Sequence, residues 1–101
     1  MKKYIMTDET IEINGHILHR IESLIDFKYV EAGDEGGYIE FEDNLSHEGN
    51  CWIFDESRVY GNVKIKDNVI VCGDSDISGE CEICGDVEIH SAELTGFCYI
   101  G

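Results

Sequence analysis

Histidine, cysteine and carboxylate side chains are the groups of this 101-residue sequence that could do chemistry. The four histidines are His16, His19, His47 and His90. A catalytic histidine needs supporting partners, and for His90, at an outward position of the chain, we favour a solvated surface residue. His16 and His19 flank a predicted turn, and we interpret them as surface or packing residues.

Cys81-Glu-Ile-Cys84 is a CxxC motif, which is typical of half a zinc site or of a redox pair. Two cysteines can share one ion only when they lie on the same side of the element that carries them. With five cysteines and no secretory leader evident behind Lys2 and Lys3, we expect free thiols and a cytoplasmic location. The absence of an 18-residue apolar run excludes a membrane-spanning helix.

A six-residue repeat dominates the sequence from residue 49 to residue 90. It consists of seven consecutive hexads: GNCWIF, DESRVY, GNVKIK, DNVIVC, GDSDIS, GECEIC and GDVEIH. The first position is Gly or Asp, which suits a turn, and the fifth is always Ile or Val, which suits a buried strand position. Such a repeat predicts a solenoid, in which each short strand buries its inner face by stacking on the next coil.

The hexad register decides what the cysteines can do. Cys81 holds a third position and Cys84 a sixth, so a regular strand points them to opposite faces. We therefore predict no metal site and no cofactor. Cys72 and His90 share the sixth position on adjacent coils, about 4.8 Å apart by strand spacing, and a two-ligand surface site there is the weaker alternative.

Residues 1–36 differ from the repeat. Asn14-Gly15 lies between two apolar-rich runs, which is a strong signal for a β-hairpin. The glycine-rich segment 33–37 predicts a connector. We predict one mostly β domain: a hairpin cap with its connector over residues 1–36, then a short β-helix of two to three coils over residues 37–101.

The Ile/Val spacing resembles that of hexapeptide-repeat β-helix proteins. More closely, the segments from Met6 to Gly15, from Ala32 to Glu40 and from Asp43 to Ile53 resemble a group of phage and prophage proteins of this type. The resemblance implies a left-handed three-sided helix with 18 residues per coil. It also implies a phage origin, with the host cytoplasm as location. Members of this group are often labelled transferases on their fold alone, which is weak evidence for an activity.

Acidity is the strongest compositional signal. The net charge is −15, from 22 acidic and 7 basic residues, and no Lys or Arg follows Lys66. Such a charge disfavours direct binding to nucleic acid or to an anionic membrane and favours a basic protein surface. Solubility alone is the plainer explanation of the charge.

These observations lead us to the hypothesis of a non-enzymatic, acidic protein-binding module. Its most specific form is a phage-encoded inhibitor of a host nucleic-acid-handling defence protein, similar to anti-CRISPR proteins and acting by nucleic-acid mimicry. The candidate partner-binding residues are Asp74, Asp76, Glu80, Glu82, Asp86, Glu88, Phe97 and Tyr99. No catalytic residue is predicted.

Two alternatives remain open. The chain is a self-assembling structural or capping module, or it is a minimal hexapeptide acyltransferase with a site around His47 or His90. The segment from Phe97 to the last residue has no polar cap, so its edge is open to strand pairing. A homodimer, another partner or a fold-back of Phe97 and Tyr99 would each cover that edge.

Overall fold

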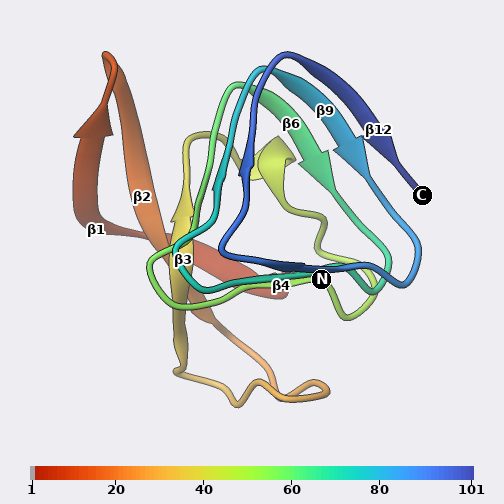
Figure 1. Ribbon diagram of the computed structural model, residues 1–101. Coiled ribbons are helices and arrows are strands. Elements are labelled where there is room, and N and C mark those ends of the chain that lie inside the picture. Colours follow the sequence, from red (N-terminus) through yellow and green to blue (C-terminus); the bar gives the residue numbers. More distant parts are fainter. Residues whose placement is uncertain (1) are drawn as a thin grey trace.

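A computed structural model describes residues 2–101, and it is built almost entirely of β-strands (Figure 1). The elements are β1 (Tyr4–Ile13), β2 (His16–Ser23), β3 (Glu35–Ile39), the 3₁₀ turn η1 (Glu42–Asn44), β4 (Trp52–Ile53), β5 (Arg58–Val59), β6 (Asn62–Ile65), β7 (Ile70–Cys72), β8 (Asp76–Ile77), β9 (Glu80–Ile83), β10 (Glu88–His90), β11 (Glu93–Leu94) and β12 (Phe97–Ile100). No helix in residues 2–101 has the length and apolarity needed to cross a membrane.

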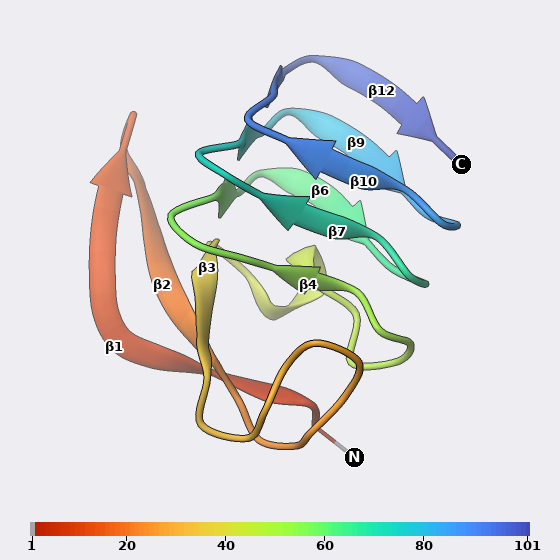
Figure 2. The same ribbon diagram turned by 60° about the horizontal axis from the view of Figure 1, so that its bottom comes forward.

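The strands form a three-sided solenoid, which confirms the predicted fold class. One face carries β4, β7 and β10, the second β3, β5, β8 and β11, and the third β6, β9 and β12, all in parallel register within the solenoid. Each coil stacks on the next, as Figure 2 shows from a second direction. That the solenoid coils in the left-handed sense stays a prediction.

The corners of the solenoid explain the first position of the hexad. All seven first positions, from Gly49 (φ 75°) to Gly85 (φ 85°), have positive φ, and the two aspartates, Asp55 and Asp67, are at 60° and 61°. Glycine reaches this conformation freely and aspartate tolerates it. The repeat of Gly and Asp therefore marks where the chain turns from one face to the next.

The core of the solenoid is made by the fifth positions. Ile53, Val59, Ile65, Val71, Ile77, Ile83 and Ile89 are all buried. They stack in register, as in the column formed by Ile53, Val71 and Ile89. Burying one such side chain contributes about 1.5–3 kcal/mol, so the stacked columns supply the main stabilising force.

The solenoid has about four turns rather than the predicted two to three. The irregular segment that contains β3 and η1 forms an additional turn below the first regular hexads, because β3 pairs with β5 and Leu45 bridges to Ile65. At the other end, β10, β11 and β12 complete a last turn. That turn is shorter by one residue, since Glu93 and not residue 94 lies beside Asp76.

The predicted hairpin is present. β1 and β2 pair antiparallel around Asn14 and Gly15, which both have positive φ. A bulge at residues 7–9 of β1 shifts the register of the hairpin. β2 also pairs with β3, so the hairpin and the solenoid share one sheet. The predicted boundary at residue 36 falls inside β3.

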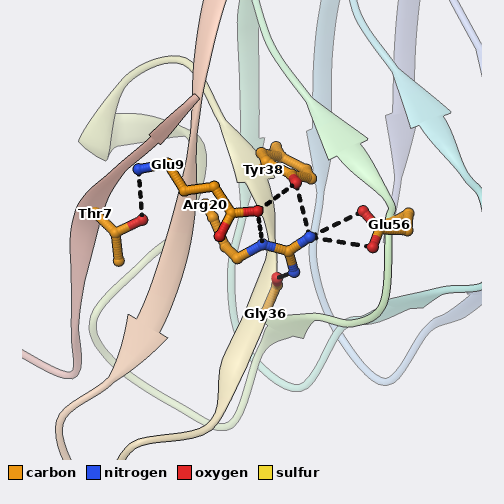
Figure 3. Close-up of polar contacts among 6 residues, drawn as sticks. All are labelled: Thr7, Glu9, Arg20, Gly36, Tyr38 and Glu56. Carbon is orange, nitrogen blue, oxygen red and sulfur yellow. Dashed lines mark hydrogen bonds and ion pairs between the residues drawn. The ribbon is translucent and has the colours of Figure 1, made fainter. Parts of the chain in front are cut away.

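Arg20 joins the hairpin to the solenoid (Figure 3). Its guanidinium donates to Glu9 on β1 at 3.0 Å, to the carbonyl oxygen of Gly36 at 2.7 Å and to the hydroxyl of Tyr38 at 2.7 Å. It also contacts both carboxylate oxygens of Glu56, in the loop between β4 and β5. One side chain on β2 therefore connects four separate segments.

The N-terminal end of the solenoid is closed by buried side-chain donors. The ammonium of Lys3 donates to the carbonyl oxygens of Cys51 at 2.7 Å and of Gly49 at 3.3 Å. The amide of Asn44 donates to the carbonyl oxygens of Gly61 and Val63, at 3.0 and 2.8 Å. Because β4 and β6 are the first strands of their sheets, no preceding strand pairs with these carbonyl groups, and the two side chains satisfy them instead.

Candidate functional site

A cleft of about 590 Å³ lies where the tip of the hairpin meets a corner of the solenoid. Its lining includes Asn14, His16, Glu40, Phe41, Tyr60 and Glu80. These residues come from the β1–β2 turn, from the segment after β3 and from corners of successive coils. The cleft thus combines the two parts of the chain.

His16 and Glu40 form the chemical centre of this cleft. Nδ1 of His16 lies 2.9 Å from Oε2 of Glu40. The imidazole also packs against the ring of Tyr60, with centroids 5.1 Å apart. The His16 side chain is 41% exposed, whereas that of Glu40 is only 14% exposed. A sheltered carboxylate therefore holds a histidine that still reaches the solvent.

The local structure fixes both members of the pair. The Asn14-Gly15 turn brings His16 to the first position of β2, opposite Ile13. Glu40 follows β3, and its second carboxylate oxygen accepts a hydrogen bond from the Gly61 amide at 3.0 Å. The backbone amide of Glu40 donates to the Asn44 side chain at 3.0 Å. Glu40 therefore has little freedom to leave His16.

This arrangement suits proton transfer. When Nδ1–H donates to Glu40, the lone pair of the neutral ring lies on Nε2, for which residues 2–101 provide no hydrogen-bond partner. A histidine oriented by a carboxylate, with its other nitrogen free, is the usual form of a general base. Among the described residues, His16 is the histidine that combines this geometry with a cleft.

The histidines named by the acyltransferase alternative are placed differently. Nδ1 of His47 accepts from the Lys3 amide at 3.0 Å and Nε2 lies 2.7 Å from Glu42, while the ring stacks on Tyr4. Both nitrogens of His47 are therefore engaged. His90 is exposed and contacts Glu88 at 3.2 Å. The site around His47 or His90 is not the one that the structure favours.

His19 is a residue of β2, and its side chain reaches back to β1, where Nδ1 lies 2.9 Å from the carbonyl oxygen of Thr7. This contact follows from the bulge in β1 and supports a packing role, as the sequence predicts for this residue. For His16, the interpretation as a surface or packing residue misses the contact with Glu40. The sequence holds no signal for that contact, because the two residues are 24 positions apart.

A second, smaller hollow of about 320 Å³ lies along β6. Lys64 and Lys66 line it together with Glu42, Ser46 and His47. Asn62, at the start of the same strand, lines the first cleft. The two hollows thus adjoin one strand. The first holds the His16–Glu40 pair, and the second holds two lysines beside the carboxylates of Glu42 and Asp43.

The predicted partner-binding acids are distributed over all three faces, with Asp76 in β8, Glu82 in β9 and Glu88 in β10. Several are engaged within the chain. Arg58 contacts Asp76 at 3.5 Å, Lys66 contacts Glu82 at 3.8 Å, and Asn68 donates to Asp86 at 2.8 Å.

Asp74 and Glu80 are exposed, as are Phe97 and Tyr99 on the last strand. The structure does not bring all of the predicted residues together in one patch. Their role in binding a partner stays a prediction.

The cysteines follow the register with one exception. Cys81 is buried and Cys84 is partly exposed, so the CxxC pair does not converge, as predicted. Cys72 and His90 are register partners, as predicted. The expectation that all five thiols are free is wrong, because β9–β12 pairing joins Cys81 to Cys98 in a disulfide. In residues 2–101 no three His, Cys, Asp or Glu side chains cluster as metal ligands.

The repeat and the three-sided solenoid define a β-helix of the hexapeptide-repeat type. No protein-family model matches the chain. It is similar to the "uncharacterized acetyltransferase YdcK" of Escherichia coli (strain K12), with 36% identity over 77 residues. The match covers 67% of this chain and 24% of that protein, so the chain spans about a quarter of the relative's length.

This similarity contradicts two predictions. The hypothesis of a non-enzymatic, anti-CRISPR-like inhibitor is wrong, and so is the expectation that the chain is not an enzyme, because the relative is named as an acetyltransferase. The hypothesis of a basic partner rests on carboxylates without a counter-charge in the sequence. Part of that charge is instead balanced inside the molecule, as in the pairs Arg58–Asp76 and Lys66–Glu82.

Proposed function

We propose that this chain is the β-helix unit of an acyltransferase, and that the cleft around His16 is its acceptor site. The observation that carries the proposal is the His16–Glu40 pair in the lining of the cleft, with no hydrogen-bond partner for Nε2 of His16 among residues 2–101. The similarity to a protein named as an acetyltransferase supports the same class of reaction.

The reaction is transfer of an acetyl group from a thioester to a nucleophile. The acceptor nitrogen or oxygen attacks the carbonyl carbon of the thioester, and Nε2 of His16 takes the proton that the acceptor releases. The new C–N or C–O bond forms as the C–S bond breaks, and the imidazolium returns its proton to the thiolate. Glu40 acts as a positioning residue, because it orients the ring and stabilises its positive charge.

A coenzyme A thioester as donor carries phosphate groups, and these need cations. Lys64 and Lys66 along β6 are suited to that role, since they line a hollow beside the same strand that borders the acceptor cleft. In a chain of net charge −15 these lysines are two of only seven basic residues. With the phosphate groups bound at the C-terminal end of β6, the thioester of the same donor would lie near His16.

The lining of the cleft favours an amine as acceptor. Glu40 and Glu80 are its acidic residues, and neither Lys nor Arg lines it. A cationic amine is attracted by such a cleft, and the rings of Phe41 and Tyr60 offer it aromatic contacts. The phage or prophage origin remains a proposal that the sequence resemblance alone supports.

The test is an assay of thiol release from acetyl-CoA with a panel of acceptors: polyamines, amino sugars, lysine-containing peptides and matched alcohols. We expect release that depends on a primary amine, with the acetylated amine identified by mass spectrometry. Lys64→Gln with Lys66→Gln raises KM for the donor and leaves KM for the acceptor unchanged. Thiol release that no acceptor stimulates, with no acetylated product, overturns the proposal.

A further inference from the structure

Backbone amides at two corners of the solenoid are hydrogen-bonded in the same way. The carboxylate of Asp55 accepts from the amide of Gly73 at 3.3 Å, and the carboxylate of Asp67 accepts from the amide of Gly85 at 2.9 Å. Each carboxylate belongs to the same corner one coil earlier, 18 residues before the amide that it binds. These corner amides are therefore directed toward the side chain of the preceding coil.

The third corner departs from this arrangement at Gly79. The amide of Gly61 still has a carboxylate acceptor, Glu40, at 3.0 Å. One coil further, the residue below Gly79 is Gly61, which has no side chain, and among residues 2–101 no atom accepts a hydrogen bond from the Gly79 amide. A Cβ atom on Gly61 would lie 3.3 Å from the nitrogen of Gly79. The space of the missing side chain thus adjoins an unpaired donor.

This unpaired donor belongs to the cleft of the candidate site. Gly61 and Gly79 line the cleft together with His16 and Glu40. At the other corners the equivalent position holds an oxygen atom of the chain itself, so here the position is open to an oxygen atom of a ligand. The cleft therefore offers a ligand two polar groups: Nε2 of His16, which takes a proton, and the amide of Gly79, which binds oxygen.

The charge of the cleft decides which kind of oxygen atom binds there. The acidic residues of the lining are Glu40 and Glu80, and neither Lys nor Arg lines the cleft. These acids repel a carboxylate or phosphate group of a ligand, whereas the aspartates at the other corners are held in place by the covalent chain. The carbonyl oxygen of a peptide group accepts a hydrogen bond and carries no net charge. A peptide carbonyl oxygen is therefore the partner that suits Gly79.

The lining of the cleft also includes an apolar surface. The side chain of Phe41 is 53% exposed and lines the cleft. An aliphatic chain that covers this ring removes apolar surface from water. A lysine residue of a polypeptide combines an amine, an aliphatic stem and neighbouring peptide carbonyl groups.

We propose that the acceptor is the side chain of a lysine residue in a polypeptide, and that the amide of Gly79 binds a backbone carbonyl oxygen beside that lysine. This inference rests on the proposed function, in which Nε2 of His16 takes the proton that the amine releases. The new C–N bond joins the acetyl carbonyl carbon to the lysine nitrogen as the C–S bond of the thioester breaks. The product is an N-acetyl-lysine residue. A polyamine lacks the carbonyl oxygen, and an amino sugar lacks the aliphatic stem.

The experiment compares two amines that differ in their peptide groups. N-acetyl-lysine-N-methylamide, a blocked lysine, has a peptide group on each side of the residue, and pentylamine has the same amine and stem without them. Binding of each to the protein is measured by NMR of the backbone amides, without acetyl-CoA. We expect the blocked lysine to bind roughly 3- to 10-fold more tightly. It should also shift the Gly79 amide proton downfield, whereas pentylamine should not.

Gly61→Asp is the test variant, because an aspartate at this corner can accept from the Gly79 amide as Asp55 and Asp67 do at theirs. Those two aspartates have φ of 60° and 61°, near the 77° of Gly61, so aspartate can adopt this conformation. Gly85→Asp is the matched control. Gly85 also has positive φ at a corner, does not line the cleft, and leaves a Cβ atom at least 3.8 Å from the nearest non-neighbouring residue.

In Gly61→Asp the ratio of the two affinities should fall to about one, and in Gly85→Asp it should stay as in the wild type. The added carboxylate acts on both amines alike, so this ratio isolates the Gly79 amide. Equal affinities in the wild type, a Gly79 resonance that the blocked lysine does not shift, or a ratio that Gly61→Asp keeps overturns the inference. Binding of the blocked lysine with these features but without acetyl transfer contradicts the proposed function alone.

Discussion

Arg20 on β2 donates hydrogen bonds to both carboxylate oxygens of Glu56, at 3.1 and 2.9 Å, across the boundary between the hairpin and the solenoid. The same guanidinium binds Glu9 and the carbonyl oxygen of Gly36. Because His16 is on the hairpin and Tyr60 is on the solenoid, this contact also helps to set the width of the cleft. The network is therefore part of the support of the candidate site.

Replacing Arg20 by Met should lower the free energy of unfolding by about 2–3 kcal/mol, because charge-assisted hydrogen bonds from a largely buried side chain are lost. Urea denaturation measures the change. Glu56→Gln, which keeps the shape and removes one charge at an exposed position, should cost less than half as much. Equal losses for the two variants would contradict a contribution from the contacts of Arg20 with Glu9, Gly36 and Tyr38 beyond that of its pair with Glu56.

Lys3→Met should destabilise the protein by about 1–3 kcal/mol, because the carbonyl oxygens of Gly49 and Cys51 lose their donor in a buried place. Lys2→Met is the matched control. Lys2 is exposed and pairs with Glu42 at the surface, so its loss should cost about 0.5 kcal/mol or less. Similar thermal melting of the two variants would contradict the assignment of Lys3 as a closing residue of the solenoid.

Gly36→Ala should destabilise by about 1–3 kcal/mol through steric conflict. A methyl group there would lie 2.6 Å from the carbonyl oxygen of Ile53 and 2.7 Å from Cγ1 of Ile21. At Gly33 the space is open but φ is +94°, so Gly33→Ala tests backbone strain alone and should cost about 1 kcal/mol. A smaller loss for Gly36→Ala than for Gly33→Ala would be inconsistent with this close packing of β3.

Acid should weaken the fold through Glu9 and Glu42. The hydrogen bond from Arg20 lowers the pKa of Glu9, and the hydrogen bond from Nε2–H of His47 lowers the pKa of Glu42, both from an ordinary value near 4.5. A carboxyl with a lowered native pKa stabilises the fold above its unfolded pKa. That stabilisation is lost as the pH falls through the native pKa.

Denaturation curves from neutral pH to about pH 3 should therefore show declining stability below about pH 4.5. In Glu9→Gln/Glu42→Gln the decline should be shallower, from a lower starting value. A double variant with the same slope as the wild type would assign acid sensitivity to other carboxyl groups.

The repeat could be predicted because each hexad makes its own corner and its own buried position. Gly61 makes a corner and Ile65 fills the core within a single hexad, and the same two positions recur in the other hexads. The Asn14-Gly15 hairpin is also a local signal. The first and last turns depart from the hexad rule, and for that reason the number of turns was underestimated.

The candidate site could not be predicted in the same way. His16 and Glu40 meet because the hairpin folds over the edge of β3, and no local pattern in the sequence encodes that approach. The Cys81–Cys98 pair could not be predicted from the repeat, because register partners on adjacent regular coils are 18 residues apart. The last turn is one residue shorter, so these two cysteines are partners at a separation of 17. Long-range pairings outside the regular repeat leave no local pattern from which they can be predicted.

The most direct measurement is the steady-state kinetics of acetyl transfer for the wild type, His16→Gln and His90→Gln. The account predicts that His16→Gln lowers kcat by about 10²–10⁴-fold with a small change in KM, as removal of a general base does. His90→Gln should behave as the wild type, and Glu40→Gln should lie between the two. Full activity of His16→Gln would contradict the assignment of this cleft as the site of acyl transfer.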